Sequence, residues 1–139
     1  MFDEQIINDV WNKGLVDDRY NPELVRKDAC GAWIIRDKYN DRENPYGWVI
    51  DHIYPKSKLE KSGVPLELID NIVNLRPLNW KNNDSKGADF PHYQAWMKAG
   101  VVPDGEGNEL DVNIDCVDEK GINDEIQKQL KEHFKGYRL

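Results

Sequence analysis

Apolar residues recur at helical spacing near both ends of the chain. Phe2, Ile6 and Val10 fall on one face of a helix that we predict over residues 3–13, ended by the polar run through Gly14. Near the other end, apolar residues at every fourth position predict a helix over residues 122–134 (Ile122, Ile126, Leu130, Phe134). Both patterns indicate helices that pack one face against a core.

In the middle of the chain, segments with the two-residue alternation of strands lie among predicted helices. Gly47 to Ile53 alternates as a strand, with Trp48 and Ile50 on one face and Val49 and Asp51 on the other. Further strands are predicted at 30–36, 74–78 and 110–117, and helices at 22–28, 80–87 and 92–99; residues 54–73 are predicted as a long loop with one helical turn. The order indicates an α+β protein.

Composition indicates a single soluble domain over residues 1–139. Hydrophobic residues make up 39% of the chain and charged residues 32%, as in globular proteins. No apolar run reaches membrane-spanning length, and the first residues lack a secretory signal. We therefore expect a cytoplasmic protein with no membrane partner. In that setting, Cys30 and Cys116 are expected to be reduced rather than bridged.

The net charge of −7 argues against a strong nonspecific DNA binder. The charge is unevenly distributed. Residues 1–22 carry −3 and residues 88–139 carry −5, whereas residues 23–87 hold ten acidic and eleven basic residues, for +1. A local basic groove therefore remains compatible with the middle of the chain.

That middle segment contains the chemistry-bearing residues. Asp51-His52 is followed by Asn74 and then by Asn83, which lies in the run Asn82-Asn83-Asp84-Ser85-Lys86-Gly87. A carboxylate beside a histidine, completed by a distant amide, suits one-metal hydrolysis of a phosphodiester. The segment from Lys27 to Phe90 resembles the HNH endonuclease motif in its His-Asn-Asn form.

The resemblance implies a small ββα-metal, treble-clef-like core over about residues 27–90. Flanking N- and C-terminal helices would surround it, with a C-terminal extension over about residues 91–139. It also implies a divalent cation, Mg²⁺ or Mn²⁺, and DNA as the partner.

The resemblance assigns roles to four residues. His52 would be the general base, a task that suits an imidazole at neutral pH. Asp51 and Asn83 would hold the metal, and Asn74 would tie down the loop that presents the histidine. Each has a plainer interpretation: a strand histidine, an exposed aspartate, or capping asparagines. Asn82 competes with Asn83 for the ligand position.

Basic residues in the same segment are candidates for binding nucleic acid: Lys56, Arg76 and Lys86. Arg76 has two open interpretations, a phosphate contact or an acidic neighbour. For Lys86 the alternative to a phosphate contact is a solvated helix lysine.

The chain departs from the commonest HNH pattern, in which two Cys-x-x-Cys pairs bind a structural zinc. The matching positions are Cys30 with Trp33, and Asn79 with Asn82. These side chains cannot form a tetrahedral thiolate site. We therefore expect no structural zinc, with Trp33 and Trp80 packing in its place.

Two classes of function compete, and a third, an acidic partner protein that inhibits another enzyme, rests on the net charge of −7 alone. The first is a metal-dependent DNA endonuclease. The alternative is a noncatalytic module, binding nucleic acid or protein, that keeps the HNH fold without turnover. The acidic charge and the missing zinc ligands favour the second, whereas the joint presence of Asp51, His52 and Asn83 favours the first.

Overall fold

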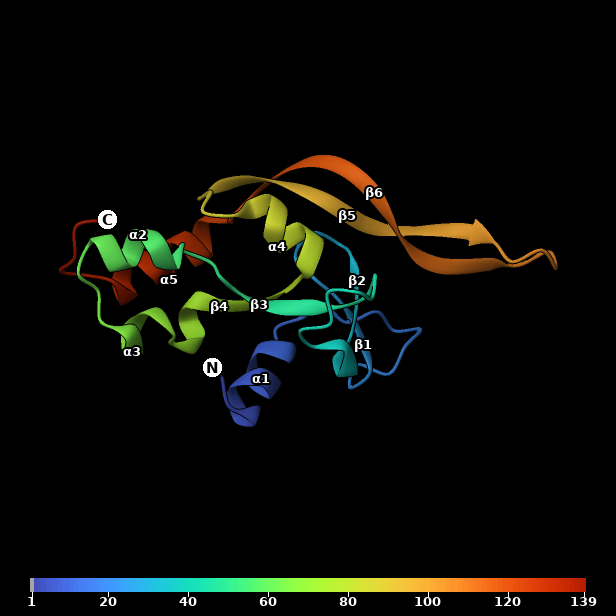
Figure 1. Ribbon diagram of the computed structural model, residues 1–139, viewed down its shortest axis with the longest axis horizontal. Helices are drawn as coiled ribbons and strands as arrows, with labels where there is room; N and C mark the ends of the chain where they lie inside the picture. Colours follow the sequence, from blue (N-terminus) through green and yellow to red (C-terminus); the bar gives the residue numbers. More distant parts are fainter. Residues whose placement is uncertain (1) are drawn as a thin grey trace.

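The computed structural model describes residues 2–139, which form five α-helices and three two-stranded antiparallel sheets (Figure 1). None of these helices is long and apolar enough to cross a lipid bilayer. Two 3₁₀ helices, Arg36–Lys38 and Ile72–Asn74, complete the secondary structure of these residues. The helices and strands are α1 (Glu4–Trp11), β1 (Val25–Lys27), β2 (Trp33–Ile35), β3 (Trp48–His52), α2 (Lys56–Lys61), α3 (Leu66–Ile69), β4 (Leu75–Asn79), α4 (Trp80–Lys86), β5 (His92–Pro103), β6 (Glu109–Gly121) and α5 (Asp124–His133).

The β3–β4 pair and α4 form a strand–strand–helix unit at the centre of the molecule (Figure 1). The register pairs Trp48 with Asn79 at one end and His52 with Leu75 at the other, without a bulge. Helix α4 begins immediately after β4, because the Asn79 side chain accepts a hydrogen bond from Lys81 N and caps the helix. The predicted strands at 47–53 and 74–78 and the predicted helix at 80–87 are confirmed.

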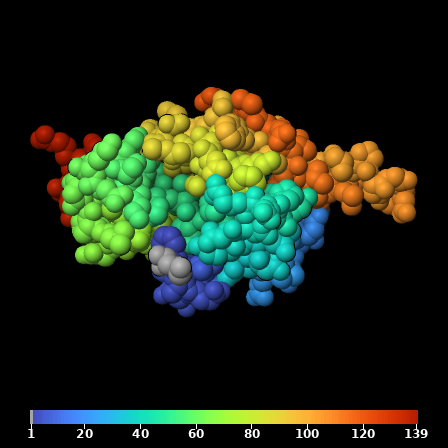
Figure 2. Space-filling view, in the orientation of Figure 1, coloured from blue at the N-terminus to red at the C-terminus, as the bar shows by residue number. Residues whose placement is uncertain are grey.

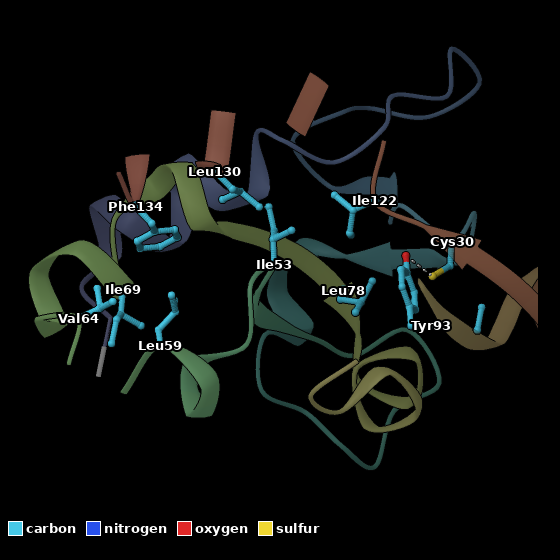
Figure 3. Packing of buried hydrophobic residues seen from close by; sticks show 11 residues of the cluster. Cys30, Ile53, Leu59, Val64, Ile69, Leu78, Tyr93, Ile122, Leu130 and Phe134 are labelled. Carbon is cyan, nitrogen blue, oxygen red and sulfur yellow. Dashed lines mark hydrogen bonds between the residues drawn. The ribbon is translucent and has the colours of Figure 1, made fainter. Parts of the chain in front are cut away.

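Two hydrophobic clusters surround this unit. One packs α1 against β2, β3 and β4, with Trp48 fully buried between Trp11 and Tyr39. The other joins α2, α3, α5 and β5, and Ile53, Leu130 and Phe134 lie within it (Figure 3). Both terminal helices thus bury the apolar faces that their spacing predicts, and Asp3 and Asn123 cap them.

Strands β5 and β6 form a long hairpin that crosses α4 and projects beyond the body of the protein (Figures 1 and 2). The predicted helix at 92–99 is therefore wrong. Tyr93, Ala95 and Met97 are buried at alternate positions, which is the period of a strand. The Asn82 side chain also accepts hydrogen bonds from Trp96 N and Met97 N, which ties this strand to α4.

Two other local predictions need correction. Residues 22–28 contain strand β1 rather than a helix, because Val25–Lys27 pairs with Trp33–Ile35. Residues 54–73, predicted as a loop with one helical turn, contain helices α2 and α3. Leu59 and Ile69 are buried in the larger cluster, so tertiary packing stabilises helices that are too short to form alone. The strands predicted at 30–36 and 110–117 are confirmed, as the shorter β2 and within the longer β6.

Candidate active site

The end of β3, the start of α2 and the end of α4 enclose a surface hollow of about 350 Å³. Asp51 and His52 of β3 and Asn83 of α4 are among the residues that line it. Neighbouring residues of a strand point to opposite faces, so a regular strand would separate Asp51 from His52. Strand β3 is regular through His52, so the Asp51 side chain faces Arg76 and Lys86, whereas the His52 ring lies on the opposite face, near Phe2. Both residues nevertheless line the hollow, which lies at the end of the strand. Residues 51 and 52 and an amide that is distant in sequence, Asn83, thus border one hollow, although Asp51 itself is only 3% exposed.

His52 lies at the rim of the hollow with one ring nitrogen engaged. Its Nε2 lies 2.7 Å from Oδ1 of Asp70, the residue that ends α3. The ring also packs near Phe2, with ring centroids 6.1 Å apart. Nδ1 makes no hydrogen bond to any residue of the described chain, 2–139. Asp70 is not among the residues predicted from the sequence, and the signal that could have pointed to it is a carboxylate shortly before Asn74.

Asn74 is fully buried and joins two loops beside the hollow. Its Oδ1 accepts a hydrogen bond from Tyr54 N at 2.8 Å. Its Nδ2 donates to Tyr54 O at 3.2 Å and to Ile69 O at 3.1 Å. The amide therefore fixes the backbone two residues after His52, which is the position that the expected role of Asn74 requires.

Asp51 is buried between two cations. Its Oδ2 accepts a hydrogen bond from Arg76 Nε at 2.9 Å, and its Oδ1 lies 3.2 Å from Lys86 Nζ. Lys86 also donates to the backbone oxygen of His52 at 3.1 Å. Burial lowers the pKa of Lys86, and the Asp51 carboxylate opposes that shift. The two basic side chains stabilise a buried carboxylate that would otherwise be costly.

These contacts correct two of the three predicted nucleic-acid contacts. Arg76 and Lys86 are 8% and 1% exposed, so neither side chain is available to a phosphate. The alternative interpretation of Arg76, an acidic neighbour, is the correct one. Lys86 is neither a phosphate contact nor a solvated lysine. Lys56, the third predicted residue, is exposed and lines the hollow.

The structure distinguishes the two candidate amide ligands. Asn82 is fully buried, and its side chain is fully engaged with Asp28 and with the backbone of β5. Asn83 lines the hollow, and its side chain makes no hydrogen bond to the described residues. Asn83 rather than Asn82 is therefore the amide that lines the hollow together with Asp51 and His52.

The donors in the hollow fit a weakly held hard cation. Within residues 2–139 there is no group of three or more His, Cys, Asp and Glu placed to hold a metal. Asp51 and Asn83 offer one carboxylate and one amide oxygen, and Mg²⁺ commonly takes few protein ligands and keeps several waters. A carboxylate has about four lone-pair positions, and two of those on Asp51 are used by Arg76 and Lys86. The same two cations oppose a further positive charge, so tight binding is not expected.

A buried carboxylate, Asp28, joins the segment that holds Cys30 to the segment that holds Asn79 and Asn82, where a structural zinc was considered on the basis of the sequence. Its Oδ1 accepts hydrogen bonds from Cys30 N and Ala32 N, both at 2.9 Å. Its Oδ2 accepts from Asn79 N at 2.9 Å and from Asn82 Nδ2 at 3.1 Å. Asp28 is fully buried. Burial raises the pKa of its carboxyl, although all four hydrogen bonds oppose that shift.

The expectation that tryptophans take this place is therefore wrong. Trp33 packs against Tyr20, with ring centroids 5.1 Å apart, and the Trp80 indole donates to Asn44 O. Cys30 and Cys116 are both free cysteines. The sulfur of Cys30 lies 3.6 Å from the Tyr93 hydroxyl (Figure 3). A hydrogen-bonded carboxylate, rather than aromatic packing, holds the turn after β1 against the start of α4.

No protein-family model matches this chain, and searches of curated proteins and of solved structures found no match. The case for a function rests on the geometry and chemistry of the hollow.

Proposed function

We propose that the protein is a metal-dependent endonuclease of the HNH type that hydrolyses DNA phosphodiester bonds. The observation that carries the proposal is the hollow that Asp51, His52 and Asn83 line at the end of β3. They lie on a strand–strand–helix unit, formed by β3, β4 and α4, which is the arrangement expected for a ββα-metal core. Folding alone does not require an aspartate, a histidine and an unpaired asparagine to border one hollow.

His52 is the general base of the proposed reaction. Its Nε2 is engaged by Asp70, so Nδ1 is the nitrogen that takes a proton from the attacking water. Asp51 and Asn83 would hold a Mg²⁺ or Mn²⁺ ion, which supplies Lewis-acid stabilisation of the phosphate charge. Lys56, exposed at the rim, contributes a positive charge where a phosphate would enter.

The alternative is a noncatalytic module that binds nucleic acid or protein on the same fold. One observation favours it: Asp51, the candidate metal ligand, is already paired with Arg76 and Lys86. The net charge of −7 also disfavours DNA as a tightly bound partner. Against it, neither His52 Nδ1 nor the Asn83 side chain has a structural partner in residues 2–139, and a binding module would have no need to keep both free.

Cleavage of supercoiled plasmid with Mg²⁺ or Mn²⁺ tests the proposal. His52→Ala should lower the cleavage rate by about 10²–10⁴-fold, because general-base catalysis typically contributes that much. His92→Ala is the matched control, since His92 is exposed on β5 and lies outside the hollow. Its rate should equal that of the wild type.

Two results would contradict the proposal. Equal cleavage by a well-folded His52→Ala protein would remove the histidine from the mechanism. A folded wild-type protein that cuts no plasmid with either metal would favour the noncatalytic alternative.

A further inference from the structure

We propose that Asp70 is a positioning residue that holds His52 in one tautomer, with the proton on Nε2 and Nδ1 free to act as the base. The catalytic consequence rests on the proposed function, whereas the tautomer itself does not. The carboxylate oxygen lies 2.7 Å from Nε2. The side chains of Asp70 and His52 are 30% and 18% exposed, so water competes only in part for the contact.

The chemistry of the pair decides which nitrogen carries the proton. A neutral imidazole has one N–H donor and one acceptor nitrogen, and an ionised carboxylate can only accept. Nε2 is therefore the donor to Asp70, and Nδ1 is left as the acceptor. No lysine or arginine of residues 2–139 forms an ion pair with Asp70, so the histidine is its side-chain partner. A base oriented by a third group is a recurring arrangement in hydrolytic sites.

The backbone around the pair is held by a single amide. Asn74 Nδ2 donates to Ile69 O, one residue before Asp70, and to Tyr54 O, two residues after His52. The backbone hydrogen bonds between β3 and β4 continue one residue beyond the strands, because Ile53 N donates to Asn74 O at 2.8 Å. Because Asn74 bridges the loop of the acid and the loop of the histidine, it fixes the separation between them.

The test compares Asp70→Asn with Glu67→Gln. Glu67 lies on the same short helix and is exposed, so its variant makes the same change of charge without touching His52. An amide can either accept from or donate to Nε2, so Asp70→Asn should allow both tautomers. We expect kcat for plasmid cleavage to fall about 10- to 100-fold with KM nearly unchanged, because Asp70 orients the base and does not line the hollow.

Nitrogen-15 NMR of the imidazole gives a readout that does not depend on cleavage. In the wild type with a neutral ring, the His52 signals should show protonated Nε2 and unprotonated Nδ1. Asp70→Asn should show a mixture, Glu67→Gln should match the wild type, and Asp70→Glu should recover part of both the signal and kcat.

The outcomes separate this inference from the proposed nuclease activity. A wild-type His52 with its proton on Nδ1 overturns the positioning role, whether or not DNA is cut. An Asp70→Asn protein with wild-type kcat and an unchanged His52 spectrum overturns it while leaving the nuclease proposal standing. A protonated Nε2 that depends on Asp70, in a protein without cleavage, supports the contact and contradicts the nuclease proposal alone.

Discussion

Replacing Asp28 with asparagine should destabilise the protein severely, although the change is nearly isosteric. The carboxylate accepts four hydrogen bonds, two on each oxygen, in a fully buried position. Asparagine must place an NH₂ group where one of these oxygens was. In one orientation it faces Cys30 N and Ala32 N, and in the other it faces Asn79 N and Asn82 Nδ2. Either way, two buried donors lose their acceptor.

The magnitude follows from these two lost bonds. Hydrogen bonds to a charged group contribute about 1.5–3 kcal/mol each, so the gross loss is about 3–6 kcal/mol. Burial of the Asp28 charge is itself unfavourable, as its raised pKa indicates, and the neutral amide recovers part of that cost. We expect a net loss of about 2–4 kcal/mol, against a total stability of about 5–15 kcal/mol for a typical domain.

Urea unfolding followed by tryptophan fluorescence and by circular dichroism measures the change. The midpoint should fall by about 1–2 M, with the slope unchanged if the protein still unfolds in two states. Asp18→Asn is the control, because Asp18 is exposed and lies outside this cluster, and its effect should stay within about 0.5 kcal/mol. A wild-type midpoint for Asp28→Asn would refute the view that this carboxylate joins the two segments. A stoichiometric zinc in the purified protein would contradict the separate expectation that no structural zinc is bound.

Three further predictions concern the metal, the substrate and the thiols. EDTA should abolish the proposed plasmid cleavage without shifting the thermal midpoint, because the proposed ion would have only two protein ligands and the turn after β1 is joined to the start of α4 by Asp28 rather than by a metal. Loss of the cooperative melt on chelation would contradict this. The affinity for DNA, measured in Ca²⁺, should depend only weakly on salt concentration. Arg76 and Lys86 are buried, so exposed residues such as Lys56 and Lys58 are left to neutralise about two or three phosphates. A slope of log affinity against log salt near that of about eight phosphate contacts would show a more extensive basic surface. A disulfide-exchange reagent should modify Cys116 well before Cys30, because Cys30 is 3% exposed and burial raises its pKa to about 12. Equal rates of modification of the two thiols in the folded protein would contradict the burial of Cys30.

The spacing of apolar residues was sufficient to predict most helices and strands. It failed where contacts with segments distant in sequence decide the conformation. The terminal helices and the strands of the central unit follow from apolar spacing and from capping residues such as Asn123. Residues 92–99 combine helix-forming residue types with an alternating pattern, and the helix was the wrong choice. The strand forms there because β6 pairs with it on both sides of an irregularity between Ala95 and Met97, and because Asn82 binds its backbone at that point. Those partners are distant in sequence, so spacing alone does not reveal them.

The sequence by itself determined which residue types could carry chemistry: the acid–histidine pair, the two asparagines after it, and the missing cysteine pairs. Only the tertiary structure decided what each side chain faces. It placed Asn83 rather than Asn82 in the hollow, turned Arg76 and Lys86 inward onto Asp51, and set Asp70 against His52. A motif records residue types and spacing, whereas hydrogen bonds and burial depend on which segments the fold brings within a few ångströms of one another. The orientation of a polar side chain is therefore decided by contacts that lie far away along the chain.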